Sequence, residues 1–155
     1  MAVELFEKMN TRAILVRGGN ATALARGMLK AIREGCLLVA TIDNVTAGPR
    51  GMPCRIFGRQ VGFPAWAVEM AARRAVPMVP AWFSSVDGRI ECSFGEPMVA
   101  EDPRRLLEHY VDFLESHILA DAPSWAYLAD RKWRAVLGAA AASPAATGAE
   151  EAAGA

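Results

Sequence analysis

Residues 21–43 read ATALARGMLKAIREGCLLVATID and place a helix pattern directly before a strand pattern. Four apolar residues recur at helical spacing in the first part, namely Leu24, Met28, Leu29 and Ile32. Gly35 marks the end of this helix pattern, because glycine commonly follows the last helical turn. The next residues, CLLVATID, are continuously apolar and rich in β-branched side chains, which is typical of a strand buried in a parallel sheet. We therefore predict a helix that leads into a buried strand at residues 36–43.

A second apolar run, AILV at residues 13–16, precedes the helix pattern. Strand, helix and strand within about thirty residues make a βαβ unit, whose crossover is right-handed in ~98% of cases. This unit predicts parallel pairing between residues 13–16 and 36–43.

The middle of the chain alternates turn residues with short apolar runs. The sequence CRIFG at residues 54–58 favours an edge strand. Pro64 suits the first turn of a helix over residues 65–75. Residues 82–94 read as a hairpin with VDG as its turn.

Two further amphipathic helices are predicted, at residues 101–119 and 124–137. Together these elements predict the α/β class, with a mixed, mostly parallel sheet flanked by helices. Residues 1–137 form one domain in this interpretation. Residues 138–155 are alanine-rich and have nothing to bury, so we expect a disordered tail there.

Composition excludes several classes of protein. The 17 basic and 17 acidic residues give no net charge, which argues against a nucleic-acid partner. The three cysteines, Cys36, Cys54 and Cys92, lack metal-site spacing, so we predict no metal site and a reducing, cytosolic setting. No apolar run approaches the ~20 residues of a spanning helix, and we expect no transmembrane segment.

Asp43 follows the predicted buried strand, where α/β proteins commonly place a site. It either orients a basic group or a substrate hydroxyl, or it caps the following loop through its own side chain. Five arginines lie between residues 50 and 74, and they suit either a phosphate, an anionic membrane surface or plain solvent. Pro77 and Pro80 shape either one wall of an apolar groove or an edge strand.

Residues suited to catalysis are scarce. The two histidines, His109 and His117, lie on the helix predicted at residues 101–119, with Asp112 and Asp121 three and four positions later. Such pairs are common on helix surfaces. No nucleophile elbow, phosphate-binding loop or dinucleotide fingerprint is present in the sequence. We therefore assign no catalytic residue.

Four blocks of the sequence occur in an order that resembles the lysophospholipid acyltransferase-like family, in particular the bacterial lipid A biosynthesis lauroyl/myristoyl acyltransferases. The blocks are AIREGCLLVATIDN, GPRGMPCRIFGRQVGFPAWAVEMA, RRAVPMVPAWF and APSWAYLADRKWR. They span about residues 12–134. In the last block Asp130 stands where a histidine is usual. The resemblance implies a glycerolipid-acyltransferase-like fold that lacks its N-terminal part.

The resemblance also implies an activity. In that family a histidine of a His-x4-Asp pair removes the proton of an acceptor hydroxyl, which attacks an acyl thioester of acyl carrier protein or coenzyme A. That pair lies upstream of the matched blocks, and this chain has no histidine before His109. Six residues fall in the substrate-binding region by resemblance: Asp43, Arg50, Phe57, Gly58, Pro64 and Pro80.

Three functions are consistent with these observations. The chain is a truncated or mis-started acyltransferase that acts on a lipid such as a lipid A precursor or lysophospholipid, with no cofactor beyond the acyl thioester co-substrate. Alternatively, it is a non-catalytic protein that binds lipid or acyl carrier. A third possibility is a variant enzyme that uses His117 and Asp121. We expect a peripheral location at the cytoplasmic face of the inner membrane, and self-association through an exposed apolar sheet edge.

Overall fold

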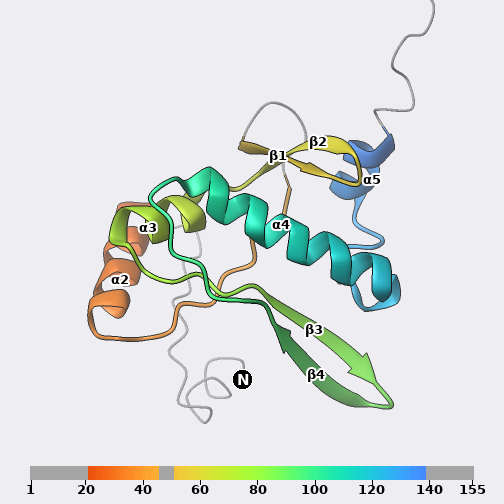
Figure 1. Ribbon diagram of the computed structural model, residues 1–155, viewed down its shortest axis with the longest axis horizontal. Coiled ribbons are helices and arrows are strands. Elements are labelled where there is room, and N and C mark those ends of the chain that lie inside the picture. The colour runs from red at the N-terminus through yellow and green to blue at the C-terminus, as the bar shows by residue number, and fades with distance from the viewer. Residues whose placement is uncertain (1–20, 46–50, 139–155) are drawn as a thin grey trace, which may run out of the picture. The chain divides into compact units, whose positions relative to one another are not determined.

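The structure, a computed structural model, describes residues 21–45 and 51–138 (Figure 1). The chain divides into two compact units, Met1–Ala40 and Thr41–Ala155, and each is described by itself. The strand predicted at residues 13–16 lies outside the described residues, as does the predicted tail from residue 139 onward.

In the first unit the predicted helix is confirmed as α2 (Ala21–Arg33). It ends as the sequence indicates, because Gly35 has a left-handed backbone with φ +75°. The N–H of Gly35 donates to the carbonyl of Ile32 at 3.1 Å, and that of Cys36 donates to the carbonyl of Ala31 at 3.0 Å. These bonds satisfy carbonyls that the last helical turn leaves unpaired.

The strand predicted at residues 36–43 is wrong. The structure has no strand there, and Leu37 and Val39 are 87% and 75% exposed. Only the end of the run is buried, because Ile42 and Val45 enter the core of the second unit as irregular extended chain. An apolar run indicates that side chains seek burial, but a strand also needs a hydrogen-bonding neighbour.

The described residues of the second unit form two antiparallel hairpins. In the first, β1 (Met52–Ile56) pairs with β2 (Arg59–Phe63), and in the second, β3 (Ala81–Val86) pairs with β4 (Arg89–Phe94). The mixed α/β class is confirmed. The mostly parallel sheet is not, because the strands within residues 21–45 and 51–138 pair antiparallel. Each pair is joined by two residues, and so short a connection allows only antiparallel pairing.

Both hairpins turn through two residues with positive φ, as type I′ turns require. Asp87 and Gly88 have φ of 49° and 74°, which confirms the hairpin predicted around VDG. Phe57 and Gly58 have φ of 51° and 71°. A bulky residue seldom adopts this left-handed conformation, and Phe57 gives no sequence signal for it. The edge strand predicted at residues 54–58 is therefore half of a hairpin whose second strand was not predicted.

The helix expected after Pro64 is α3 (Trp66–Arg74). Its N-cap is Ala65, so Pro64 lies just before the cap and not within the first turn predicted for it. The helix ends at Ala75, whose φ of 49° is left-handed and whose N–H donates to carbonyls of the last turn. Helix α3 then packs against the long helix α4.

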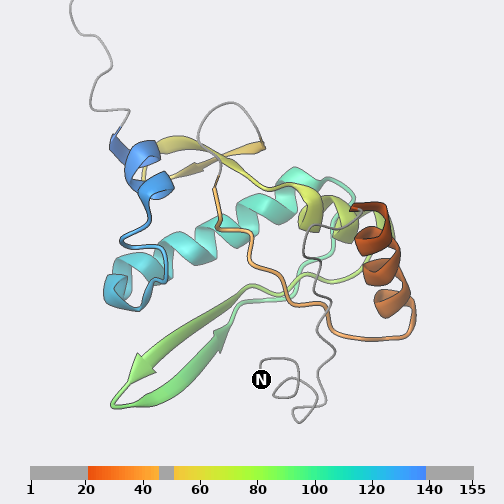
Figure 2. The same cartoon turned by 180° about the vertical axis from the view of Figure 1, so that it is seen from behind.

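Helix α4 (Pro103–Ala120) begins at Asp102, whose carboxylate accepts the N–H of Arg104 at 2.9 Å. Its apolar face is confirmed as the centre of the core, with five buried side chains: Leu106, Leu107, Val111, Leu114 and Ile118. The inward side chains of β1–β2 pack against this face, while the turn end of the β3–β4 hairpin extends away from α4 (Figures 1 and 2).

The last described elements are the short 3-10 helix η1 (Ala122–Ser124) and α5 (Arg131–Gly138). Asp130 begins α5, because its Oδ1 accepts the N–H groups of Lys132 at 2.7 Å and Trp133 at 3.1 Å. Within the described ranges, none of the helices has the length and apolar character needed to cross a membrane.

The left-handed Ala75 gives a stability prediction. We expect Ala75→Gly to raise the free energy of unfolding by about 1 kcal/mol, because glycine adopts positive φ without strain and Ala75 is exposed. Ala72→Gly, in the interior of α3, is the matched control and should lower stability by about 1 kcal/mol. Urea unfolding measures both. Equal losses for the two variants would contradict the left-handed cap.

Candidate functional site

Asp43 is held by a contact with residues ninety positions away. The Nε1–H of Trp133 donates to the main-chain carbonyl of Asp43 at 2.8 Å. Next to it, the Nζ of Lys132 donates to the Oδ1 of Asn44 at 3.0 Å. The N–H of Val45 donates to the same Asp43 carbonyl at 3.0 Å. These bonds fix the main chain of Asp43 through its carbonyl group.

Around this point lies a group of ring side chains that we call the aromatic cluster: Phe57, Phe63, Trp125 and Trp133. The two indole rings meet edge to face with centroids 4.8 Å apart. The ring centroids of Phe63 and Trp133 lie 6.1 Å apart, and those of Phe57 and Trp125 lie 6.4 Å apart. Edge-to-face pairs at these separations contribute about 0.5–1.5 kcal/mol beyond the area that they bury. The cluster thus joins the β1–β2 hairpin to η1 and α5.

The Asp43 carboxyl group is half-buried, and this burial raises its pKa above the ordinary value. The main-chain N–H of Asp43 opposes part of that rise, and so does the buried Nε1–H of Trp125, which lies near the carboxylate although it makes no hydrogen bond of standard geometry. Burial also raises the pKa of Tyr110, with smaller contributions from the charge of Asp43 and from Tyr127. The phenol of Tyr110 is therefore neutral throughout the physiological range.

This arrangement suits the binding of a polar group. A carboxylate in an apolar surround accepts a hydrogen bond from a hydroxyl, and a buried indole N–H without a partner donates to an oxygen. Asp43 and Trp125 supply these two functions side by side. Of the two roles considered for Asp43 from the sequence, both stay open: its carbonyl accepts the bonds from Trp133 and Val45, and its carboxylate interacts with its own main-chain N–H and with Trp125.

The other residues predicted for the site are divided among several places. Phe57 belongs to the aromatic cluster, and Gly58 is exposed beside it in the turn. Pro64 is half-buried between β2 and α3. Pro80 is fully buried at the base of β3, where its carbonyl accepts the N–H of Gly95 at 2.9 Å. Arg50 lies outside the described residues.

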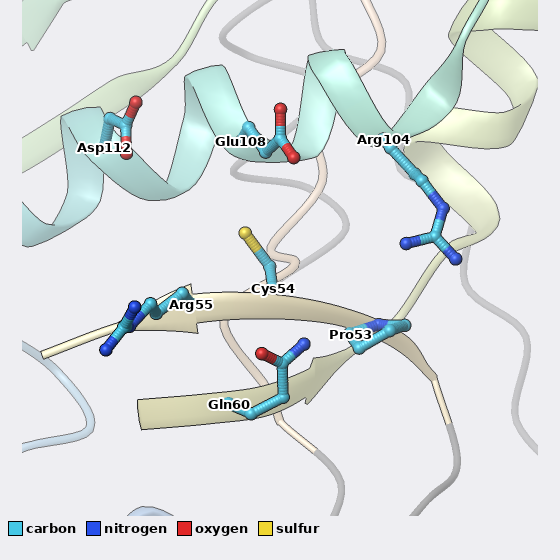
Figure 3. Close-up of a pocket in the computed structure, with 7 residues that line it drawn as sticks. All are labelled: Pro53, Cys54, Arg55, Gln60, Arg104, Glu108 and Asp112. Atoms are coloured by element: carbon cyan, nitrogen blue, oxygen red, sulfur yellow. The ribbon is translucent and has the colours of Figure 1, made fainter. Parts of the chain in front are cut away.

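A separate pocket of about 390 Å³ lies between the β1–β2 hairpin and α4 (Figure 3). Glu108 and Asp112 lie on successive turns of α4, with Arg104 toward one end of the pocket and Arg55 toward the other. Pro53, Cys54 and Gln60 complete its lining. This mixture of both charges does not form an anion site of the kind expected from the arginines.

Cys54 points from β1 into this pocket (Figure 3). Burial raises the pKa of its thiol, and the charges of Glu108, Asp112 and Glu115 raise it further. Since the thiolate is the nucleophilic form, Cys54 is an inert core residue. In the part of the chain that the structure describes, no three His, Cys, Asp or Glu side chains gather in a way that would hold a metal ion.

Both histidines are bound to main-chain carbonyls. The Nε2–H of His109 donates to the carbonyl of Glu96 at 2.7 Å, and the Nδ1–H of His117 donates to that of Phe113 at 2.9 Å. The His117 ring also packs on Phe113, with centroids 4.0 Å apart. The bond between His117 and Asp121 joins main-chain atoms and does not orient the ring. The geometry therefore does not favour a base formed by His117 and Asp121.

Tyr110, Trp125, Lys132 and Trp133 are the residues of this site that the sequence analysis did not assign. The motif APSWAYLADRKWR contains three of them, but nothing in it indicates contact with Asp43. Asp130, which departs from the family pattern, serves as the N-cap of α5.

Comparisons with protein-family models, with curated proteins and with solved structures found no match to this chain.

The bond from Trp133 to Asp43 predicts a difference between two tryptophans. Trp133→Phe and Trp125→Phe remove the same atoms from buried side chains, but only Trp133 loses a hydrogen bond of standard geometry. We expect Trp133→Phe to lower the free energy of unfolding by about 1–2 kcal/mol more than Trp125→Phe. Chemical denaturation provides the comparison. A larger loss for Trp125→Phe would show that the Asp43 loop is held in another way.

Burial of Asp43 predicts a pH dependence of stability. Because its pKa is raised, the folded chain binds this proton more tightly than the unfolded chain. The free energy of unfolding should therefore fall as the pH rises from the ordinary pKa of 3.8 through the raised value. Asp43→Asn should remove this part of the pH dependence and be more stable than wild type at neutral pH. Thermal unfolding across pH tests this, and a less stable Asp43→Asn at neutral pH would contradict it.

Proposed function

We propose that the chain is the substrate-binding part of an acyltransferase of the lysophospholipid type, which binds the acyl acceptor or the acyl thioester but does not transfer the acyl group by itself. The acceptor is a lipid hydroxyl, and the donor is a thioester of acyl carrier protein or coenzyme A. This proposal extends the resemblance in the sequence, and it also includes the glycerolipid-acyltransferase-like fold.

The observation that carries the proposal is the meeting of three separate sequence blocks at one place. Asp43 comes from the first block, Phe57 from the second, and Trp125 and Trp133 from the last. The hydrogen bond of 2.8 Å and the ring contacts join all three. Segments that are distant in sequence and converge on a half-buried carboxylate are typical of a binding site.

The proposal that the chain does not transfer the acyl group follows from the side chains that could act as a general base. Acyl transfer from a thioester needs a group to take the proton of the attacking hydroxyl. Both histidine rings instead donate to main-chain carbonyls, those of Glu96 and Phe113, and burial holds Cys54 as a thiol. Asp43 is therefore proposed to bind and orient a hydroxyl without acting as the sole base.

A second candidate function is a non-catalytic protein that binds lipid or acyl carrier at a membrane surface. The same engagement of both histidines favours it. In either case we propose a peripheral location at the cytoplasmic face of the inner membrane. The two candidates differ in whether binding is followed by transfer when a complete acyltransferase machinery is present.

A titration with a lysophospholipid or with acyl coenzyme A tests the binding, because Trp125 and Trp133 report on the site by fluorescence. We expect saturable binding that Asp43→Asn weakens about tenfold, equivalent to about 1.4 kcal/mol. Asp87→Asn is the matched control, since Asp87 is an exposed acid in the β3–β4 turn and should leave the affinity unchanged. Equal affinity for wild type and Asp43→Asn would contradict the site.

A thiol-release assay with the same acyl thioester tests the second part of the proposal. The isolated chain should release no thiol above the rate of spontaneous hydrolysis, and His117→Ala should leave that rate unchanged. Release that depends on His117 would overturn the non-catalytic assignment, while the binding result would still stand or fail by itself.

A further inference from the structure

The β3–β4 hairpin has one face that is apolar and exposed. The register places Phe83 opposite Cys92 and Ala81 opposite Phe94, and these residues share a face with Ile90. Phe83, Ile90 and Phe94 are 57%, 79% and 70% exposed. All six residues of β4 are exposed, and the hairpin reaches away from the rest of the second unit (Figure 1).

The two edges of this hairpin differ. Strand β3 carries the buried Trp82, whose ring lies 5.8 Å from that of His117, and it contacts η1. Strand β4 is therefore the more exposed strand of this hairpin. Its protection as an edge is limited: its register with β3 is continuous, without a bulge, and it contains no proline or lysine. Its two charged residues, Arg89 and Glu91, alternate with Ile90, Cys92 and Phe94 and therefore lie on the opposite face.

The hydrogen-bond pattern shows which groups of β4 face outward. The N–H of Gly95 donates to the carbonyl of Pro80 at 2.9 Å, so this is a hydrogen-bonded pair of the ladder. Such pairs alternate with non-bonded ones in an antiparallel hairpin. Ile90, Cys92 and Phe94 are consequently in non-bonded pairs, and their N–H and C=O groups point to the outer edge. The same three apolar residues of β4 therefore carry the main-chain N–H and C=O groups that are unpaired at its outer edge.

We propose that two copies of the chain associate through β4, edge to edge and antiparallel, about a two-fold axis at Cys92. In this arrangement Cys92 lies opposite the partner's Cys92, and Ile90 lies opposite the partner's Phe94. The two hairpins form one four-stranded sheet. This inference rests on the hairpin alone and is independent of the proposed function.

Charge and strand length select this register among those that keep apolar side chains on one face. If the two-fold axis moves one position toward the turn, Glu91 lies opposite the partner's Glu91. Like charges directly opposite each other are destabilising. A further shift pairs the strand with Asp87 and Gly88, whose left-handed backbone cannot continue a ladder. The Cys92-centred register joins residues 90–94 of both copies without a like-charge pair.

The same register has a geometric consequence for the thiol. Directly opposite residues in a hydrogen-bonded antiparallel pair have Cα atoms about 5.5 Å apart, which lies within the range that a disulfide spans. Cys92 is exposed, as is Cys36, whereas Cys54 is buried. Cys92 therefore reports on the arrangement of the two copies.

The first test uses oxidation of single-cysteine chains. A variant with Cys36→Ser and Cys54→Ser retains only Cys92, and mild oxidation with diamide should convert most of it to a covalent dimer. The control retains only Cys36, through Cys54→Ser and Cys92→Ser, and should stay largely uncrosslinked. Equal crosslinking of the two variants would overturn the register.

The second test measures association by analytical ultracentrifugation over a range of concentrations. Wild type should form a reversible dimer, and Cys92→Lys should weaken it by about tenfold or more, because it places two positive charges opposite each other. Phe83→Lys is the matched control on the same face but on β3, and it should have a much smaller effect. Equal effects of the two would show that the face and not the edge associates, which overturns the proposal.

The third test fixes which residues are opposite each other. Ile90→Lys and Phe94→Glu chains should each dimerise weakly alone and form a heterodimer when mixed, because residues 90 and 94 are opposed in this register. No gain on mixing overturns the register. A wild-type chain that remains monomeric at all concentrations, or that binds neutral lipid vesicles through this hairpin as a monomer, overturns the proposal as a whole.

Discussion

The burial of one face of α4 is the constraint on which the second unit depends. Five side chains of this helix are buried, and the β1–β2 hairpin and α3 both pack against it. The two hairpins are too small to be stable alone in water, since an isolated two-stranded ribbon is marginal at best. Without the apolar face of α4 neither the β1–β2 hairpin nor the aromatic cluster would have a surface on which to assemble.

The elements that local signals determine were predicted correctly. Helix α4 has an unbroken apolar stripe and a capping Asp102, and the β3–β4 hairpin has Asp87 and Gly88, which adopt the positive φ that its turn needs. The turn at Phe57 could not be predicted, because phenylalanine is a poor residue for a left-handed backbone. Its ring lies against that of Trp125, a contact that the local sequence does not indicate.

The parallel sheet shows a different limit of sequence reasoning. Residues 36–43 are apolar enough for a buried strand, and Ile42 is indeed buried, but Leu37 and Val39 are exposed. The pattern measures hydrophobicity and does not specify a partner for the main chain. Asp43 was predicted for the site because an acid after an apolar run is visible locally, and Phe57 was predicted from the resemblance; both stay predictions. The tryptophan partners of Asp43 lie far along the chain and could be assigned only from the fold.

The contact between Phe57 and Trp125 bears on how the chain acquires its structure during synthesis. The ribosome releases Phe57 long before Trp125, so the left-handed turn must wait for the ring that supports it. The strain at Phe57 disfavours early closure of the β1–β2 hairpin, and the later arrival of α4 and η1 makes closure favourable. The ring that packs on the left-handed turn thus becomes available to the β1–β2 hairpin only after residue 125 has been synthesised.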